Sequence, residues 1–324
     1  MSLRISRRKF LAGVGALAGA SAASSIPSFG LFEPALYPPM DLSYFNTPIA
    51  AAPADIQIGY ASITWNGDDK QAIEDISALG FHGIQLRSNA VKEFGSAAEL
   101  RDLLQKHQLK LVALSSGNVI VDPAAEKDQI TLHTANAKFV HDVGGLYLQL
   151  IDQKPKDRAV TDADYKQLGK LLTEIGKRSA DLGIKVGYHN HMGTISEQPE
   201  ALEKVLAASD PRYAKLELDV AHYFQGGGDP AKAIQKHADR LLFLHIKDVE
   251  PAPAEADSRG RPYRWVELGQ GKVDLPAVFD SLHKVKFRGW AIVELDTVPD
   301  KSKTPKDSAA ISKKYLEEKL GVTV

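Results

Sequence analysis

Eight short apolar runs, separated by longer amphipathic stretches, constrain the fold of this chain from residue 56 onward. The runs cover residues 56–61, 83–87, 109–115, 146–151, 184–189, 214–220, 241–248 and 290–296. Short apolar runs bounded by turn residues are typical of buried strands. Amphipathic stretches such as 68–80 and 165–183 end in glycine, which is a helix stop signal placed directly before the next strand. The chain is therefore expected to alternate between strands and helices.

This alternation predicts a single-domain (β/α)8 TIM barrel over residues 55–324. Eight strand–helix units in a segment of this length match the usual size of that fold. A doubly wound open sheet is the main alternative, and it usually carries a glycine-rich phosphate-binding turn after its first strand. The chain instead has "GYASITWNGDD" at that point, which is not such a turn.

Residues 1–23 have the three-part layout of an export signal: a basic start, an apolar stretch and small residues. Arg7-Arg8, followed by Lys-Phe-Leu, resembles the twin-arginine motif. A membrane anchor is the alternative, but the apolar run is short and rich in Gly and Ala. We expect export to a bacterial periplasm by the twin-arginine route, cleavage near Ala20 to Ala23, and no stable membrane span after processing.

Residues 24–54 are rich in Pro, Ser and Ala, which predicts an irregular linker. Removal of the signal takes away four basic residues and no acidic one, which changes the formal charge from −1 to −5. Such a chain has no positive footprint for nucleic acid. The chain has no cysteine, which excludes disulfides, a thiol nucleophile and cysteine metal sites.

Polar residues close several of the predicted strands, at the end of a TIM barrel where active sites lie. Asp219, His245 and Glu294 close three successive strands, and together they suit Mn²⁺, Co²⁺, Zn²⁺ or Mg²⁺. Lys247 lies two residues beyond His245, so it faces the same way and would stabilise an oxyanion. Glu217 lies deeper on the same face as Asp219, where we expect it to be paired or to have a raised pKa. A metal site at this rim is therefore favoured.

Five segments carry a resemblance to a known family: "YHNHMGT", "LELDVAHYFQGGGDP", "LLFLHIKDV", "VELGQGKVDLPAVFDSL" and "GWAIVELD". They resemble the xylose isomerase-like TIM barrel superfamily of sugar isomerases and epimerases. The segments "IGYASITWNGDD" and "YHNHMGT" are most similar to inosose dehydratase and related keto-sugar lyases. The resemblance spans residues 56–320 and implies one divalent metal, with Mn²⁺ or Co²⁺ favoured over Zn²⁺ or Mg²⁺. Three of the family's four metal ligands correspond to Asp219, His245 and Glu294. His189 stands where the family has a glutamate, so the fourth ligand is His189 or else Gln149.

The resemblance also implies proton abstraction next to a carbonyl of a small carbohydrate substrate. We expect a dehydratase or lyase of an inosose or 3-keto sugar, with a sugar isomerase or epimerase as the alternative. The expected catalytic residues are His191, His222, Lys247 and Glu294. Substrate contacts are expected from Trp65, Arg87, His222 and Lys247.

Two alternatives of other classes are less well supported. A phosphodiesterase like the AP endonucleases would need histidines on the second and third strands, which instead end in Arg87 and Ser115-Ser116. A non-catalytic sugar-binding barrel is disfavoured by the complete set of Asp219, His245 and Glu294. Homo-oligomerisation stays open.

We predict that the mature chain begins near residues 21–24, because a twin-arginine signal is removed after a small-residue cleavage site. N-terminal sequencing of the protein from its native cells measures this directly. Cytosolic material that begins at Met1 or Ser2 would contradict the prediction.

Overall fold

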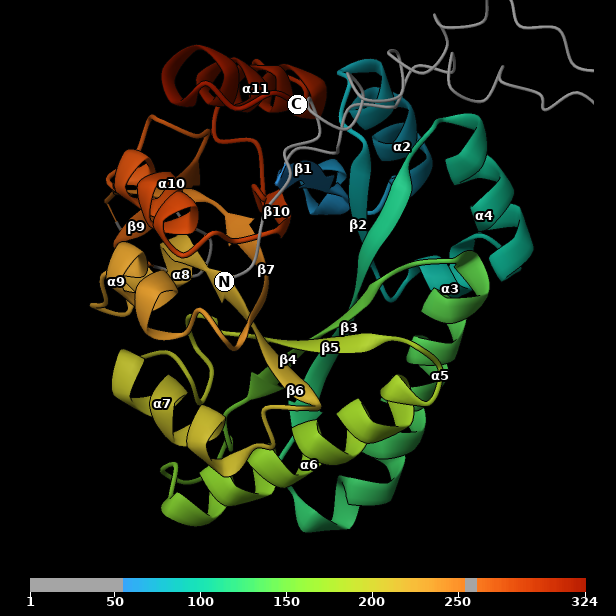
Figure 1. Ribbon diagram of the computed structural model, residues 1–324, viewed down its shortest axis with the longest axis vertical. Helices are drawn as coiled ribbons and strands as arrows, with labels where there is room; N and C mark the ends of the chain where they lie inside the picture. Colours follow the sequence, from blue (N-terminus) through green and yellow to red (C-terminus); the bar gives the residue numbers. More distant parts are fainter. Residues whose placement is uncertain (1–54, 254–260) are drawn as a thin grey trace, which may run out of the picture. The chain divides into compact units, whose positions relative to one another are not determined.

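Eight parallel strands close into a barrel in the order β1-β10-β7-β6-β5-β4-β3-β2 in the computed structural model of the chain (Figure 1). The structure describes residues 55–253 and 261–324, so the predicted signal over 1–23 and the linker over 24–54 lie outside the described residues. The barrel strands are β1 Ile56–Ala61, β2 Gly83–Arg87, β3 Lys110–Ile120, β4 Tyr147–Gln153, β5 Lys185–His189, β6 Ala214–Asp219, β7 Leu241–Ile246 and β10 Gly289–Val293. The predicted TIM barrel is confirmed.

Helices surround these strands (Figure 1). The α-helices are α2 Asp69–Ala78, α3 Ala90–Glu93, α4 Ala97–Lys106, α5 Glu126–Val143, α6 Asp162–Ala180, α7 Pro199–Ala208, α8 Val220–Gln225, α9 Pro230–Lys236, α10 Leu275–Lys284 and α11 Pro305–Leu320. Short 3₁₀ turns lie at η2 Ser62–Trp65 and η3 Pro123–Ala125. Side chains cap several helix starts, including a capping box at Thr304 before α11. Within the part of the chain that is described, every helix is too short or too polar to span a bilayer.

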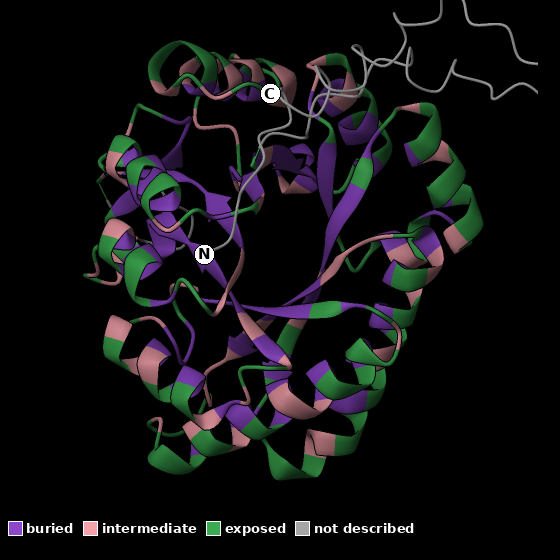
Figure 2. Cartoon of the chain, viewed as in Figure 1, coloured by how far each residue is buried: buried purple, intermediate pink, exposed green. Residues whose placement is uncertain are grey.

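The barrel strands are buried, and exposed residues lie mainly on the outer faces of the helices (Figure 2). Phe243 and Ile292 belong to a small apolar cluster that also contains Trp290. Phe243 precedes His245 by two residues, and Ile292 precedes Glu294 by two, so each pair shares one face of its strand. This apolar cluster therefore forms a floor beneath the polar strand ends.

Two glycines make room for that floor. A Cβ atom on Gly83 would lie 2.2 Å from the Trp290 ring, and one on Gly187 would lie 2.6 Å from the Phe243 ring. These distances are far below van der Waals contact, so only glycine allows the large aromatic rings to fill the barrel.

Several predicted strand ends shift in the structure for local reasons. The strand predicted over 214–220 stops at Asp219, because the Asp219 carboxylate caps α8, which begins at Val220. The strand predicted over 109–115 continues to Ile120 beyond an irregularity between Ser115 and Asn118. The segment predicted as one strand over 241–248 is interrupted, since β7 ends at Ile246 and a separate strand begins at Asp248.

The structure adds an antiparallel hairpin that was not predicted. Its strands are β8 Asp248–Pro251 and β9 Tyr263–Val266, and they form a separate two-stranded sheet. The hairpin follows β7, one of the strands with metal-ligand candidates. It therefore brings additional side chains to the site.

Asp248 connects two segments of the chain, residues 245–248 at the end of β7 and residues 269–274 before α10. Its buried carboxylate accepts hydrogen bonds from the backbone N–H groups of Val249, Gly269, Gly271 and Val273, at 2.9 to 3.1 Å. One side chain thus satisfies four backbone donors and ties the loop before α10 to the end of β7.

We predict that Asp248→Ala lowers the free energy of unfolding by about 3 kcal/mol or more, because four backbone donors lose an ionised acceptor. Asp274→Ala is the matched control, since Asp274 caps α10 through one bond to Ala277, and its loss should cost only about 1 kcal/mol. Urea denaturation followed by circular dichroism measures both changes. Equal losses in the two variants would contradict the role given to Asp248.

Candidate active site and metal centre

His245 lies at the centre of the site, and its two ring nitrogens face two different sets of side chains. Nδ1 lies 3.6 Å from Asp219 Oδ2 and 3.3 Å from Glu294 Oε2. Nε2 lies 2.8 Å from Glu217 Oε1 and 3.0 Å from Gln85 Oε1. The side chains that face His245 come from β2, β4, β6 and the end of β10, so barrel closure assembles the group.

Asp219 has one occupied and one unused oxygen. Oδ1 accepts hydrogen bonds from the N–H groups of Ala221 and His222, at 2.9 and 2.8 Å. Oδ2 is buried and has no hydrogen-bond partner among the described residues, and the same is true of His245 Nδ1. Leaving such atoms unpaired in a protein interior costs free energy. Their orientation toward one point is the pattern of ligands around a cation.

These residues fit a divalent metal. The ligand atoms of Asp219, His245 and Glu294 lie within 4.8 Å of one another, and all three residues are buried. Two carboxylates and one imidazole suit Mn²⁺, Co²⁺ or Zn²⁺. The group matches the three ligands expected from the strand ends.

Glu217 is the supporting partner of His245. Its carboxylate accepts from Gln149 Nε2 at 2.8 Å and faces His245 Nε2 at the same distance. A carboxylate at Nε2 keeps the proton on that nitrogen and directs the Nδ1 lone pair toward a metal. Burial raises the pKa of Glu217, and His245 and Gln149 oppose that shift. The expectation that this carboxylate is paired and has a raised pKa is confirmed.

Lys247 is fully buried and lies beside the metal-ligand group. Its Nζ donates to Glu294 Oε1 at 2.9 Å and to Asp296 Oδ1 at 2.5 Å. Burial alone would lower the pKa of Lys247, but Asp296 and Glu294 raise it overall, so the side chain is an ammonium. For Glu294 the two effects have the opposite signs. Burial alone would raise the pKa of its carboxyl group, but His245 and Lys247 hold that pKa well below its usual value.

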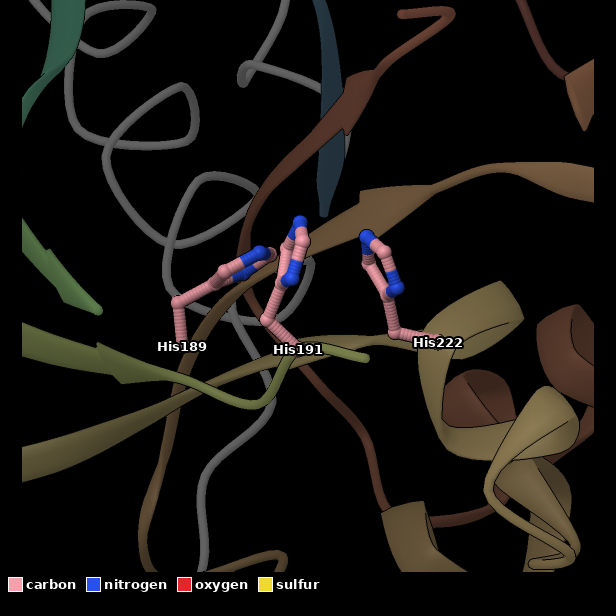
Figure 3. A group of neighbouring side chains, drawn as sticks. All are labelled: His189, His191 and His222. Atoms are coloured by element: carbon pink, nitrogen blue, oxygen red, sulfur yellow. The ribbon is translucent and has the colours of Figure 1, made fainter. Parts of the chain in front are cut away.

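Three further histidines belong to the site, and their rings lie side by side (Figure 3). His189 ends β5, His191 follows in the next loop, and His222 lies on α8. Ring centroids are 5.6 Å apart for His189 and His191, and 3.8 Å apart for His191 and His222. Burial lowers the pKa of each of the three, so all are neutral near pH 7.

Asn190 explains the amide between the two histidines of "HNH". Its Nδ2 donates to the backbone oxygen of Asp219 at 3.1 Å, and its Oδ1 accepts from the Asp219 N–H at 3.0 Å. This two-way bond joins the ends of β5 and β6. His189 therefore lies at a fixed position relative to Asp219.

The structure brings together most, but not all, of the predicted site. His189 does not join the group of Asp219, His245 and Glu294; it lies in two neighbouring groups, one with Glu217 and His245 and one with His191 and His222. A neutral imidazole offers one lone pair, so His245 can serve only one of the two groups that include it. Gln149, the other candidate for fourth ligand, donates to Glu217. Both assignments stay predictions.

Two predicted substrate contacts lie at or just after the ends of β1 and β2, and within the described ranges they make their hydrogen bonds outside the site or none. Trp65 is buried, and its indole N–H donates to Asp75 of α2 at 2.9 Å, which is a packing role. Arg87 ends β2 and is exposed. Among the described residues, neither side chain forms a hydrogen bond, ion pair or ring contact with the histidines or carboxylates of the site. Their predicted roles stay predictions.

Trp265 of β9 was missed by the sequence reasoning. Its ring centroid lies 4.6 Å from that of His222, and Lys247 Nζ lies 4.4 Å from the same ring. Its indole nitrogen is buried and has no hydrogen-bond partner within the described ranges. The sequence signal that could have identified Trp265 was a site lysine, Lys247, followed along the chain by a short strand with an aromatic residue.

A protein-family model and proteins of similar sequence both match most of this chain. The family model described as "Xylose isomerase-like TIM barrel" matches residues 73–319. The inosose dehydratase of Lacticaseibacillus casei is 26% identical over 299 residues, which cover 82% of this chain and 98% of that protein. The inosose dehydratase of Clostridium tetani is 25% identical, with the same two coverages.

Solved structures share the fold at lower identity. The IolI protein with a bound zinc atom has a TM-score of 0.69 and 20% identity, over 81% of this chain and 97% of IolI. The D-allulose 3-epimerase of Methylomonas sp. has a TM-score of 0.67 and 20% identity, over 83% of this chain and 99% of the epimerase. A probable 3-DHS dehydratase, AsbF of Bacillus anthracis, also has a TM-score of 0.67, at 16% identity over 81% of this chain and 99% of AsbF.

We predict that Asp219→Asn loses most of its bound divalent metal while the barrel stays folded. The amide keeps an oxygen that can cap α8 but replaces the unused Oδ2 with a donor, which cannot bind a cation. Asp296→Asn is the matched control, because Asp296 pairs with Lys247 and lies outside the ligand group. Metal content of the purified proteins is the measurement. Full metal content in Asp219→Asn would remove Asp219 from the ligand set.

Proposed function

The chain belongs to the xylose isomerase-like TIM barrel family, and from that premise we propose that it is a metal-dependent enzyme acting on keto-sugars or keto-polyols. The proposed reaction begins with removal of a proton from the carbon beside the substrate carbonyl. We further propose that the reaction is a dehydration or related elimination on an inosose or 3-keto sugar.

One observation carries this proposal: Glu294 joins the metal-ligand group to the buried ammonium. Its Oε2 lies 3.3 Å from His245 Nδ1, and its Oε1 accepts from Lys247 Nζ at 2.9 Å. A divalent cation held by Asp219, His245 and Glu294 would supply Lewis-acid polarisation of a carbonyl. Lys247 places a second positive charge beside the same pocket. Two cationic centres at one wall suit a reaction in which an oxygen gains negative charge.

The chain's own residues provide the remaining steps. An ammonium has three donors, and two of those on Lys247 are used by Glu294 and Asp296, so one remains for a substrate oxygen. His191 is neutral and is suited to accept the proton from carbon. Trp265 lies over Lys247 and His222 and would keep water from the reacting carbon.

The fate of that proton distinguishes the two candidate reactions. Loss of a hydroxyl from the next carbon gives dehydration, which the inosose dehydratase relatives support. Return of the proton to the opposite face gives epimerisation, which the likeness to D-allulose 3-epimerase supports as the second candidate. We place dehydration first because the relatives matched in sequence are dehydratases over nearly their whole length.

We also propose a periplasmic location for this reaction. The support is the Arg7-Arg8 pair and the weakly apolar segment that follows it. Free keto-sugars suit an exported enzyme better than sugar phosphates do.

We predict that Lys247→Met lowers turnover by about a hundredfold or more, because removal of a charge-stabilising donor typically costs a few kcal/mol in the transition state. Metal content should stay unchanged, since Lys247 contacts the ligand Glu294 but offers no lone pair itself. Lys314→Met on α11 is the control, because Lys314 is largely exposed and lies on a helix that contributes nothing to the site. Steady-state rates of metal-loaded proteins on inososes and 3-keto sugars give the measurement. A fully active Lys247→Met would exclude the assigned role.

We expect deuterium from solvent to enter recovered substrate or product at the carbon beside the carbonyl. The reason is that the abstracted proton is held by a side-chain base, where it exchanges with solvent before a proton is returned to carbon. Mass spectrometry of reactions run in D₂O detects the label. Turnover without any exchange, combined with an active Lys247→Met, would exclude the enolisation mechanism and favour a hydrolytic one.

A further inference from the structure

We propose that the two backbone groups of Met192 hold His191 and His222 in opposite neutral tautomers, so that His191 presents an acceptor and His222 a donor to the same pocket. The tautomers follow from hydrogen-bond geometry alone. The use made of them in catalysis rests on the proposed function. Met192 was not among the expected site residues.

The backbone carbonyl group of Met192 determines the tautomer of His191. Its Nδ1 lies 2.6 Å from the backbone oxygen of Met192. A carbonyl oxygen can only accept, so Nδ1 must carry the hydrogen. In a neutral ring this leaves Nε2 with a lone pair, and Nε2 is the nitrogen that can take a proton.

The backbone N–H group of Met192 determines the tautomer of His222. The backbone N–H of Met192 donates to His222 Nδ1 at 3.2 Å. That nitrogen therefore carries no hydrogen, and the ring hydrogen lies on Nε2. His222 Nε2 faces Asp219 Oδ2 at 3.9 Å, next to the candidate metal position. It is therefore a donor aimed at the place where a substrate oxygen would lie.

The contact with Lys247 competes with the Met192 N–H in setting the tautomer of His222. Lys247 Nζ lies 3.5 Å from His222 Nε2, whereas its bonds to Glu294 and Asp296 are 2.9 and 2.5 Å. An ammonium can only donate, so this long contact taken alone would favour a lone pair on Nε2, whereas the shorter contact from the Met192 N–H requires the lone pair on Nδ1. The assignment also removes His222 Nε2 as a ligand, so the group of His189, His191 and His222 cannot hold a metal through three ring nitrogens.

The loop that carries Met192 is tied down on both sides. Thr194 Oγ1 donates to the His191 oxygen at 2.7 Å, and the Ile195 N–H donates to the buried carboxylate of Asp152 at 2.6 Å. Asp152 also accepts from the Tyr188 hydroxyl at 2.6 Å. The backbone of Met192 is thereby fixed relative to β5, and the two rings lie next to each other with centroids 3.8 Å apart (Figure 3).

The arrangement defines one balanced catalytic step. His191 Nε2 takes the proton from the carbon beside the carbonyl, and the C–H electron pair moves to give an enolate oxygen. His222 Nε2–H donates a hydrogen bond to a substrate oxygen and keeps its proton. His191 is then the base, His222 is a catalytic donor, and Met192 is a positioning residue.

Nitrogen-15 NMR of the histidine rings tests the tautomers without any substrate. The protein is labelled at both ring nitrogens and studied at neutral pH without metal and after loading with Zn²⁺. Signals are assigned with His191→Gln and His222→Gln. We expect a hydrogen on Nδ1 of His191 and on Nε2 of His222. The same tautomer in both rings, or two ring hydrogens on His222, would overturn the proposal.

Two substitutions at Met192 separate backbone from side chain. Met192→Leu keeps both backbone groups and should leave both tautomers unchanged. Met192→Pro removes the N–H, so His222 should lose its fixed tautomer while His191 keeps its Nδ1 hydrogen. Circular dichroism checks that the proline variant is folded, and the wild-type spectra decide the question if it is not. A changed His222 tautomer in Met192→Leu would contradict the backbone assignment.

Glutamine substitutions test the division of labour. A glutamine amide can donate a hydrogen bond but cannot carry a proton from carbon. His191→Gln should therefore lower kcat at least a hundredfold, while His222→Gln should stay within about tenfold of wild type and His222→Leu should fall well below it. The reverse order would overturn the catalytic roles while the NMR result stands. Absence of activity on every keto-sugar would contradict the proposed function but not the tautomers.

Discussion

The ion pair between Glu217 and His245, whose Oε1 and Nε2 atoms lie 2.8 Å apart, is the interaction on which the rest of the site depends. It places a carboxylate in the barrel interior, where an ionised group without a partner would cost several kcal/mol. Gln149 donates a hydrogen bond to the Glu217 carboxylate, and the Gln85 amide oxygen faces His245 Nε2. Nε2 of His245 faces Glu217 in the barrel interior, so Nδ1 points toward the rim of the barrel. Asp219 and Glu294 lie around Nδ1. The direction of the whole ligand group follows from this one buried pair.

The pleat of the strands separates this polar layer from the floor beneath it. Residues two apart on a strand share a face, so Phe243 lies below His245 and Ile292 lies below Glu294. A packed apolar floor under a ring of charged groups keeps water away on one side. That low-polarity setting strengthens each electrostatic interaction in the layer above.

Much of this arrangement could be predicted from the sequence, since it depends on periodicity and on barrel geometry. The eight strands and the group of Asp219, His245 and Glu294 follow from apolar runs that end in polar residues. The hairpin that carries Trp265 could not be predicted, because β8 and β9 are four residues each and lack a clear alternation. The roles of Asn190 and Met192 were also out of reach. These roles depend on backbone hydrogen bonds between residues far apart in the sequence, and the pattern of side chains along the chain does not predict such bonds.

The separate hairpin sheet has a consequence for how such an enzyme can change over evolution. Trp265 reaches Lys247 and His222 from strands that share no ladder with the barrel. Replacement of this aromatic residue would alter the surface offered to a sugar ring without disturbing the hydrogen bonds that align the ligand group. Substrate preference can therefore diverge through mutations in the hairpin while the machinery of the barrel is inherited intact.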